Sequence, residues 1–148
     1  MMSTYVAERR LLIVIEPDKT SVTARHAGKA LSRIPSAGAV GKVAKAGGVA
    51  GAVVGGGIEA MYSVGEVIRG KKDVTDAAGD IAYAGAKGGA SGYAGAAAGT
   101  LAAGVTSAAV VATIGTGLVA TVAPAVVGFG AACAVGSFVS DMFDDIFG

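Results

Sequence analysis

Charge, aromatic side chains and catalytic residue types are all scarce in this sequence. Of its 148 residues only 16% are charged and 5% are aromatic, and tryptophan is absent, whereas charged residues average about 25% in soluble domains. Hydrophobic residues nevertheless reach 53%, beside 25 glycines, so the apolar mass consists of small side chains. This composition excludes intrinsic disorder and collagen, and a conventional water-soluble core would be hard to build from it.

Residues that carry chemistry are isolated in the sequence. The single cysteine, Cys133, excludes an intramolecular disulfide and a Cys-based zinc site, and the single histidine, His26, lies among basic residues. Neither has a partner that would complete a pair of nucleophile and base, and no glycine cluster ends in the Lys-Ser/Thr of a phosphate loop. We therefore expect no enzymatic activity, no cofactor and no metal site. The neighbouring carboxylates are interpreted as solvated helix faces: Asp76 with Asp80, and Asp144 with Asp145.

Acidic and basic residues are separated along the chain, although the net charge is only +1. Six bases and no acid occur between Lys19 and Lys45, whereas the last eight residues contain three aspartates and no base. The small net charge argues against nucleic-acid binding, which needs a basic excess. The acidic end either caps a hydrophobic hairpin or pairs with the basic arm of a neighbouring copy. Anionic lipid attracts basic side chains, and those predicted to contact the membrane surface are Arg25, Lys29, Arg33, Lys42 and Lys45.

Residues 1–38 are predicted to form a polar and basic arm. The apolar run at 11–15, which ends in the β-branched residues 13–15, is typical of a strand, which would pair only with another copy or a partner. This run is too short for the hydrophobic region of a secretory signal, so we expect none. Over residues 23–34 the bases recur every four positions and the apolar residues lie on another side. This pattern predicts a short amphipathic helix that Pro35 stops.

Residues 39–148 form the hydrophobic domain, and 53 consecutive positions in it, 88–140, carry no charge. A helix needs about 20 residues to cross a bilayer, so this stretch is long enough to cross twice, with a turn at 115–117. Within 39–68 the longest uncharged run is the thirteen residues 46–58, which is too short for a clean crossing. A polar break follows at 70–73, where Asp73 or Thr75 can begin the next helix. The alternative interpretation is a buried helical hairpin in a soluble bundle.

Small residues recur at every fourth position in the apolar segments. This spacing places them on one helix face, where the lack of side chains lets a second backbone approach closely. In water each such glycine would cost about 1 kcal/mol of helix stability relative to alanine, so their accumulation favours a role in packing. The residues predicted to pack helices are Gly47, Gly51, Gly55, Gly88, Gly92, Gly95, Gly99, Gly104, Gly128 and Gly136.

Over residues 39–140 this pattern resembles the glycine-zipper membrane segments of helical channels, holin-like proteins and the hydrophobic domains of bacterial pore-forming toxins. The resemblance implies tight pairing of helices and self-association, and it carries over no functional residue.

The sequence thus predicts an all-α protein: a glycine-rich helical hairpin packed with a further small-residue helix, preceded by the strand-like segment and the basic amphipathic helix. As function we expect a homo-oligomer that inserts into a lipid bilayer and permeabilises or depolarises it. Its location would be a bacterial inner membrane or a target-cell membrane, and no immunity or regulatory partner is identified. The alternative is a non-enzymatic structural protein that forms a close-packed ring, shell or filament.

Overall fold

Every regular element that the structure describes is an α-helix. The structure, a computed structural model, describes residues 29–114 and 118–147. Helix α2 spans Ala37–Ile68, α3 spans Val74–Ile114 and α4 spans Leu118–Phe147. The all-α prediction is confirmed for this part of the chain. The strand-like segment 11–15 and residues 23–28 of the basic helix lie outside the described residues.

Helix α2 begins after a proline and a capping serine. The Ser36 hydroxyl accepts a hydrogen bond from the Ala39 amide at 3.3 Å, which satisfies one of the free amides of the first turn. The basic helix predicted for 23–34 ends earlier, at Leu31. The reason is that Pro35 disfavours helical backbone in the residue before it. Helix α2 also begins two residues before the boundary at 38/39 that composition suggests.

Gly70 makes the tight connection between α2 and α3. Its φ of 66° lies in the left-handed region that glycine adopts without a steric penalty. The Gly70 amide donates to the Val67 carbonyl and the Lys71 amide to the Glu66 carbonyl, which are the two bonds of a Schellman motif. The Asp73 carbonyl then accepts a bond from the Ala77 amide, so α3 begins directly after Asp73.

Helices α3 and α4 are separated by three residues. The turn predicted at 115–117 lies outside the described residues, but α3 ends at Ile114 and α4 begins at Leu118, on either side of it. Pro124 lies inside α4, which continues through it to Phe147.

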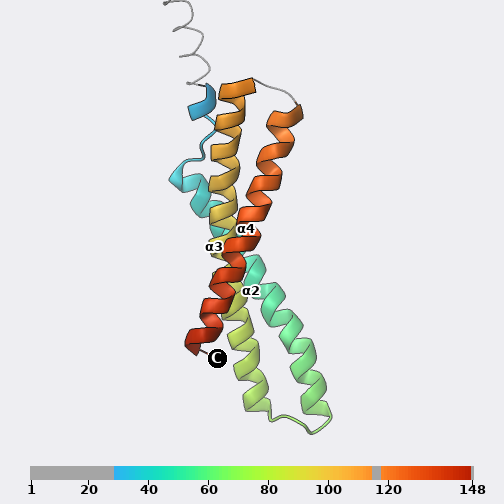
Figure 1. Ribbon diagram of the computed structural model, residues 1–148. Helices are drawn as coiled ribbons and strands as arrows, with labels where there is room; N and C mark the ends of the chain where they lie inside the picture. The colour runs from blue at the N-terminus through green and yellow to red at the C-terminus, as the bar shows by residue number, and fades with distance from the viewer. Residues whose placement is uncertain (1–28, 115–117, 148) are drawn as a thin grey trace, which may run out of the picture.

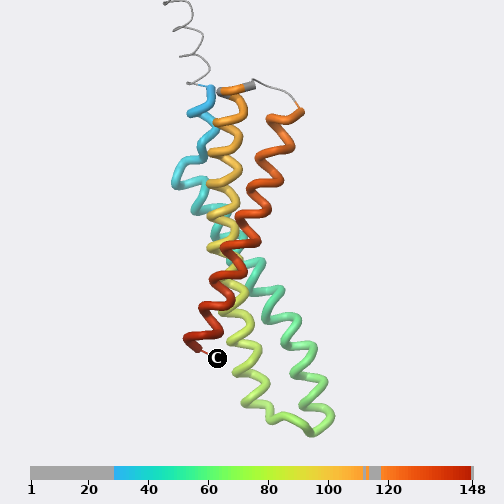
Figure 2. The backbone as a smooth tube through the Cα atoms, viewed as in Figure 1, coloured from blue at the N-terminus to red at the C-terminus, as the bar shows by residue number. Residues whose placement is uncertain are grey.

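Helix α3 is the centre of the arrangement. It contacts both α2 and α4, whereas α2 and α4 do not contact each other. Figure 1 shows that α2 and α3 diverge towards the connection at 69–73, and that α3 and α4 diverge towards the opposite end. The tube in Figure 2 shows the two close crossings near the middle of α3, with the C-terminal end of α4 beside the first half of α3.

The buried residues are small, and most large apolar side chains face outwards. The largest buried hydrophobic residue in the described part is Val111, and the others are the alanines at 30, 44, 77 and 120. Exposed apolar side chains occur on all three helices, for example Met61, Leu101 and Phe129. Helix contacts therefore depend on close backbone approach and not on interlocking large side chains.

Candidate membrane-spanning hairpin and helix-packing site

Glycines make the contact between α2 and α3. A Cβ added at Gly55 would lie 2.6 Å from the Ala84 carbonyl oxygen. One added at Gly51 would overlap the Gly88 carbonyl, and one added at Gly47 would overlap Ala96 and lie 2.6 Å from the Gly92 carbonyl. Each step of four along α2 matches a step of four backwards along α3, so the helices pair antiparallel in a regular register.

The second half of α3 contacts α4 through a separate row. A Cβ added at Gly95 would lie 2.7 Å from the Ala132 carbonyl oxygen, and one added at Gly99 would lie 2.8 Å from the Gly128 carbonyl oxygen. Gly136 is looser, with the Ser91 carbonyl at 3.5 Å. Helix α3 therefore uses two neighbouring glycine rows, one for each partner helix.

Gly104 lies against a different part of the chain from the other predicted packing residues. A Cβ at this position would overlap the Pro35 ring and lie 3.4 Å from the Arg33 carbonyl oxygen. The segment before α2 therefore runs alongside the second half of α3. The spacing of four placed Gly104 in one row with Gly88 and Gly92, because helical periodicity does not show where one partner ends and another begins.

Alanines take part in both contacts, although the predicted packing set lists only glycines. Ala84 faces Gly55, Ala103 faces Gly128, and Ala132 faces both Gly95 and Gly99. The four-residue spacing already places Ala103 in one row with Gly99 and Ala132 in one row with Gly128, whereas Ala84 requires the row of Gly88 to be extended by one step. Two further pairs, Gly48 with Tyr93 and Gly89 with Ala52, lie beside the main α2–α3 row.

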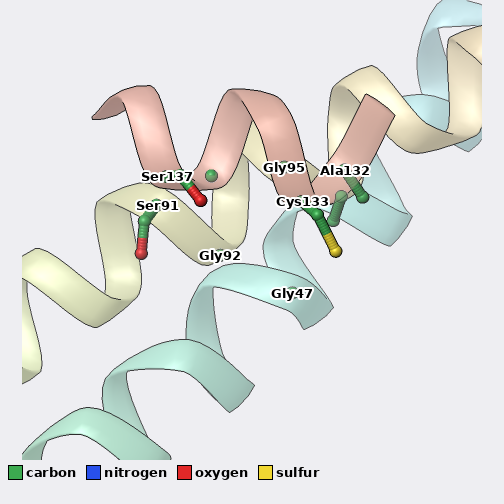
Figure 3. Close-up of a pocket in the computed structure, with 9 residues that line it drawn as sticks. Gly47, Ser91, Gly92, Gly95, Ala132, Cys133 and Ser137 are labelled. Atoms are coloured by element: carbon green, nitrogen blue, oxygen red, sulfur yellow. The ribbon is translucent and has the colours of Figure 1, made fainter. Parts of the chain in front are cut away.

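An open groove of about 480 Å³ lies where the three helices meet. In Figure 3 its floor is formed by Gly92 and Gly95 of α3, with Gly47 on one side and Ala132 and Cys133 on the other. Cys133 is an exposed free thiol. The Ser91 hydroxyl donates to the Gly88 carbonyl of its own helix at 3.2 Å. Ser137 supplies the second hydroxyl of a lining that otherwise consists of glycine, alanine and cysteine, so the groove offers little polarity for binding a ligand.

A polar cluster joins the two ends of the uncharged segment. The Lys87 ammonium lies 2.5 Å from the Asp144 carboxylate, and the Tyr83 hydroxyl donates to the same carboxylate at 2.7 Å. The Tyr83 and Phe143 rings pack with centroids 5.4 Å apart. Lys87 is the last charge before residues 88–140, and Asp144 belongs to the first acidic group after them. Sequence reasoning missed this pair, although charges that flank one uncharged stretch on both sides are the signal for it.

A second cluster holds the α2–α3 connection. Lys72 pairs with Asp80 and lies 3.6 Å from Glu66. The hydrogen bond to Asp80 is the main cause that raises the pKa of the Lys72 ammonium, against a smaller opposing effect of desolvation. Further along α2, the buried Ser63 hydroxyl donates to Glu59 at 2.9 Å. The carboxylates at 80 and 144, predicted as solvated, are therefore partly exposed members of ion pairs.

The predicted membrane-surface bases lie along the outside of the molecule. Lys29, Arg33, Lys42 and Lys45 are exposed. The ion pairs found within residues 29–114 and 118–147 involve only Lys72 and Lys87 among the bases. Arg25 lies outside the described residues. These four cations are thus available to an anionic surface.

The packing register places exposed cations beside uncharged helix. Lys42 and Lys45 precede Gly47, which lies against Ala96, and Arg33 lies against Gly104. A 30 Å hydrocarbon layer corresponds to about 20 helical residues. Every window of that length within residues 88–114 of α3 includes both Ala96 and Gly104. A hydrocarbon layer placed around the uncharged part of α3 would therefore also contain Arg33, Lys42 and Lys45, as long as α2 and the segment before it stay packed on α3.

Three helices are long and apolar enough to span a membrane by length and composition: Ala37–Ile68, Val74–Val111 and Leu118–Phe147. The last two confirm that the uncharged stretch supplies two candidate spans. Helix α2 also qualifies, contrary to expectation, because its 32 residues extend beyond the thirteen uncharged ones and the flanking charges are few. In the described residues no group of three or more His, Cys, Asp or Glu side chains is arranged to hold a metal ion.

No protein-family model, curated protein or solved structure matches this chain. Its function must be inferred from the helices themselves.

Proposed function

We propose that this protein inserts the α3–α4 hairpin into a lipid bilayer, self-associates and permeabilises the membrane, as pore-forming toxins and holin-like proteins do. One observation carries the proposal. The uncharged residues 88–114 and 118–140 belong to two antiparallel helices, and the charges at their two ends meet at one level through Lys87 and Asp144. A bilayer favours this arrangement, because it places the charged ends at an interface and only uncharged residues between them.

The outward-facing side chains support contact with lipid. In α4 the side chains of Val126 and Phe129 are 65% and 74% exposed, and in α3 Leu101 and Val105 are also exposed. Contiguous apolar surface of this kind marks a membrane or protein interaction site in a folded chain. Lipid would cover it without any further folding of the hairpin.

Glycine rows support close association of helices within lipid. Lipid tails are as apolar as the side chains, so helices associate there through close packing and not through the hydrophobic effect. The rows that contact α2 and α4 within one chain have this geometry, and a homo-oligomer would use the same type of contact between copies. The exposed bases from Lys29 to Lys45 would bind anionic lipid headgroups at the surface.

Vesicles containing a self-quenching dye test the proposal. Purified protein added to vesicles of phosphatidylcholine and phosphatidylglycerol is expected to release the dye and to remain with the lipid after alkaline carbonate. Cross-linking in the vesicles is expected to give discrete oligomers. Protein that neither partitions into the vesicles nor releases dye would overturn the proposal.

The position of exposed cations beside uncharged α3 favours a second candidate, the non-enzymatic structural assembly. These cations would be solvated if the protein stays in water, and neighbouring copies would cover its apolar surfaces. The expected pairing of the acidic end of one copy with the basic arm of a neighbour gives this assembly less support, because Asp144 pairs with Lys87 of its own chain. A large particle that stays soluble without detergent and is removed by carbonate would favour this candidate over the pore.

A further inference from the structure

We infer that α2 is a releasable cover: it must separate from α3 before the α3–α4 hairpin crosses a bilayer. The inference rests on the proposed membrane function and adds a conformational step to it. The arrangement with α2 docked is then the state before insertion.

The first argument is the mismatch between the uncharged parts of the helices. Residues 46–58 of α2 are uncharged, but Gly55 lies against Ala84 and Gly47 against Gly92. About half of the uncharged part of α2 therefore lies beside the charged first part of α3, before residue 88. Only residues 46–51 pair uncharged α2 with uncharged α3, and this overlap is far shorter than the about 20 residues of a bilayer crossing.

Consequently, no position of the bilayer accommodates both helices as docked. If the hydrocarbon layer covered residues 88–107 of α3, Ala96 would lie well inside it. Lys42 and Lys45 of α2, which lie near the level of Ala96, would then also be in hydrocarbon. A layer over 95–114 would place the level of Gly104, with exposed Arg33 beside it, in the middle. A layer shifted towards residue 74 would contain the exposed Asp141 and Asp145 of α4. Exposed charges are strongly disfavoured in hydrocarbon.

The α2–α3 contact is also of a kind that can open. Its closest approaches are between glycines and alanines, with Tyr93 beside Gly48. No large apolar side chain of α2 is buried, so separation of the helices removes none from a core. Helix α2 does not contact α4, and its only helix partner in the described residues is α3. The contacts of α4 with α3 do not involve α2, so the hairpin can stay closed while α2 leaves.

A reversible disulfide tests this release directly. A Cβ added at Gly89 would lie 3.3 Å from the Ala52 Cβ, close to the separation in disulfides. Ala52→Cys with Gly89→Cys, in a Cys133→Ser background, should therefore lock α2 to α3 on oxidation. The matched controls are the single variants Ala52→Cys and Gly89→Cys in the same background, neither of which can form this disulfide.

Dye release and carbonate-resistant binding are measured with vesicles of phosphatidylcholine and phosphatidylglycerol, before and after reduction. The oxidised α2–α3 pair is expected to lose at least tenfold in the rate of dye release and to regain it on reduction, whereas each single-cysteine variant releases dye at the same rate before and after reduction. Equal release by the oxidised and reduced α2–α3 pair would overturn the inference and leave the membrane function standing. If the reduced proteins also fail to bind vesicles, the proposed function fails and the release step fails with it.

Discussion

At the scale of single residues, glycine has opposite effects at two positions of the same helix. Glycine in a helix interior is less stable than alanine by about 1 kcal/mol, so replacement by alanine ordinarily stabilises. Gly57 has nothing within 4 Å of an added Cβ, whereas a Cβ at Gly51 would overlap the Gly88 carbonyl. At Gly57, helix propensity favours alanine and the packing does not oppose it. At Gly51, helix propensity favours alanine but the packing against α3 excludes its methyl group.

Gly51→Ala is expected to lower the free energy of unfolding by about 1–3 kcal/mol, because the backbones must move apart to admit the methyl group. Gly57→Ala is the matched control and is expected to raise it by about 0.5–1 kcal/mol. Denaturation of the purified protein in detergent, followed by circular dichroism, measures both. Equal stabilisation by the two substitutions would contradict the α2–α3 packing described above.

Lys87 and Asp144 are expected to couple weakly but measurably. Both side chains are partly exposed, at 27% and 48%, so solvent screens their attraction and the coupling energy should be small. A double-mutant cycle with Lys87→Met and Asp144→Asn, measured by unfolding in detergent, gives this energy. It should decrease as salt is raised. Additive effects of the two substitutions would show that the pair contributes nothing to holding α4 on α3.

At the scale of elements, α4 and α2 differ in what their exposed faces contact. The outer face of α4 lies within the uncharged segment, whereas the end of α2 lies at the charged connection to α3. Lipid should therefore surround the middle of α4 and not the end of α2.

Val126→Lys on α4 is expected to reduce membrane insertion, because a lysine near the centre of a spanning helix costs about 3 kcal/mol. Val126 is 65% exposed, and Ile68 at the end of α2 is 80% exposed, so Ile68→Lys adds the same charge as a matched control. The carbonate-resistant fraction should fall at least tenfold for Val126→Lys and stay unchanged for Ile68→Lys. If both variants behave like the parent protein, the middle of α4 does not lie in hydrocarbon.

At the scale of the whole molecule, the absence of tryptophan permits a clean test of depth in the bilayer. Phe129 on α4 and Tyr62 on α2 are both well exposed, at 74% and 70%. Either position should accept a tryptophan without disturbing a buried contact.

Phe129→Trp is expected to show blue-shifted fluorescence and strong quenching by lipids brominated deep in their acyl chains. Tyr62→Trp should be quenched weakly by the same lipids, because α2, once released from α3 as inferred above, is expected to stay outside the bilayer. Strong and equal quenching of both probes would mean that α2 also spans the membrane. No quenching of either probe would favour the soluble assembly.

The sequence shows which residues are small enough to pack closely. It does not show which helix each of them contacts. Spacing of four marks Gly47, Gly51 and Gly55 as one face because helical periodicity is a local property. It does not reveal that Gly92 belongs to the α2 contact and Gly99 to the α4 contact, or that Gly104 meets Pro35. Those assignments depend on the angle and register at which the helices cross.

The sequence by itself determined the helical class, the uncharged hairpin segment and the small-residue faces, because composition, charge spacing and periodicity are properties of the chain alone. Only the tertiary structure decided the register of α2 on α3, and with it the position of the cations beside uncharged helix. It also brought Lys87 to Asp144, 57 residues away in the sequence. The physical reason is that glycine rows permit close approach at several registers, and the one adopted is set by which backbones and side chains fit together in space.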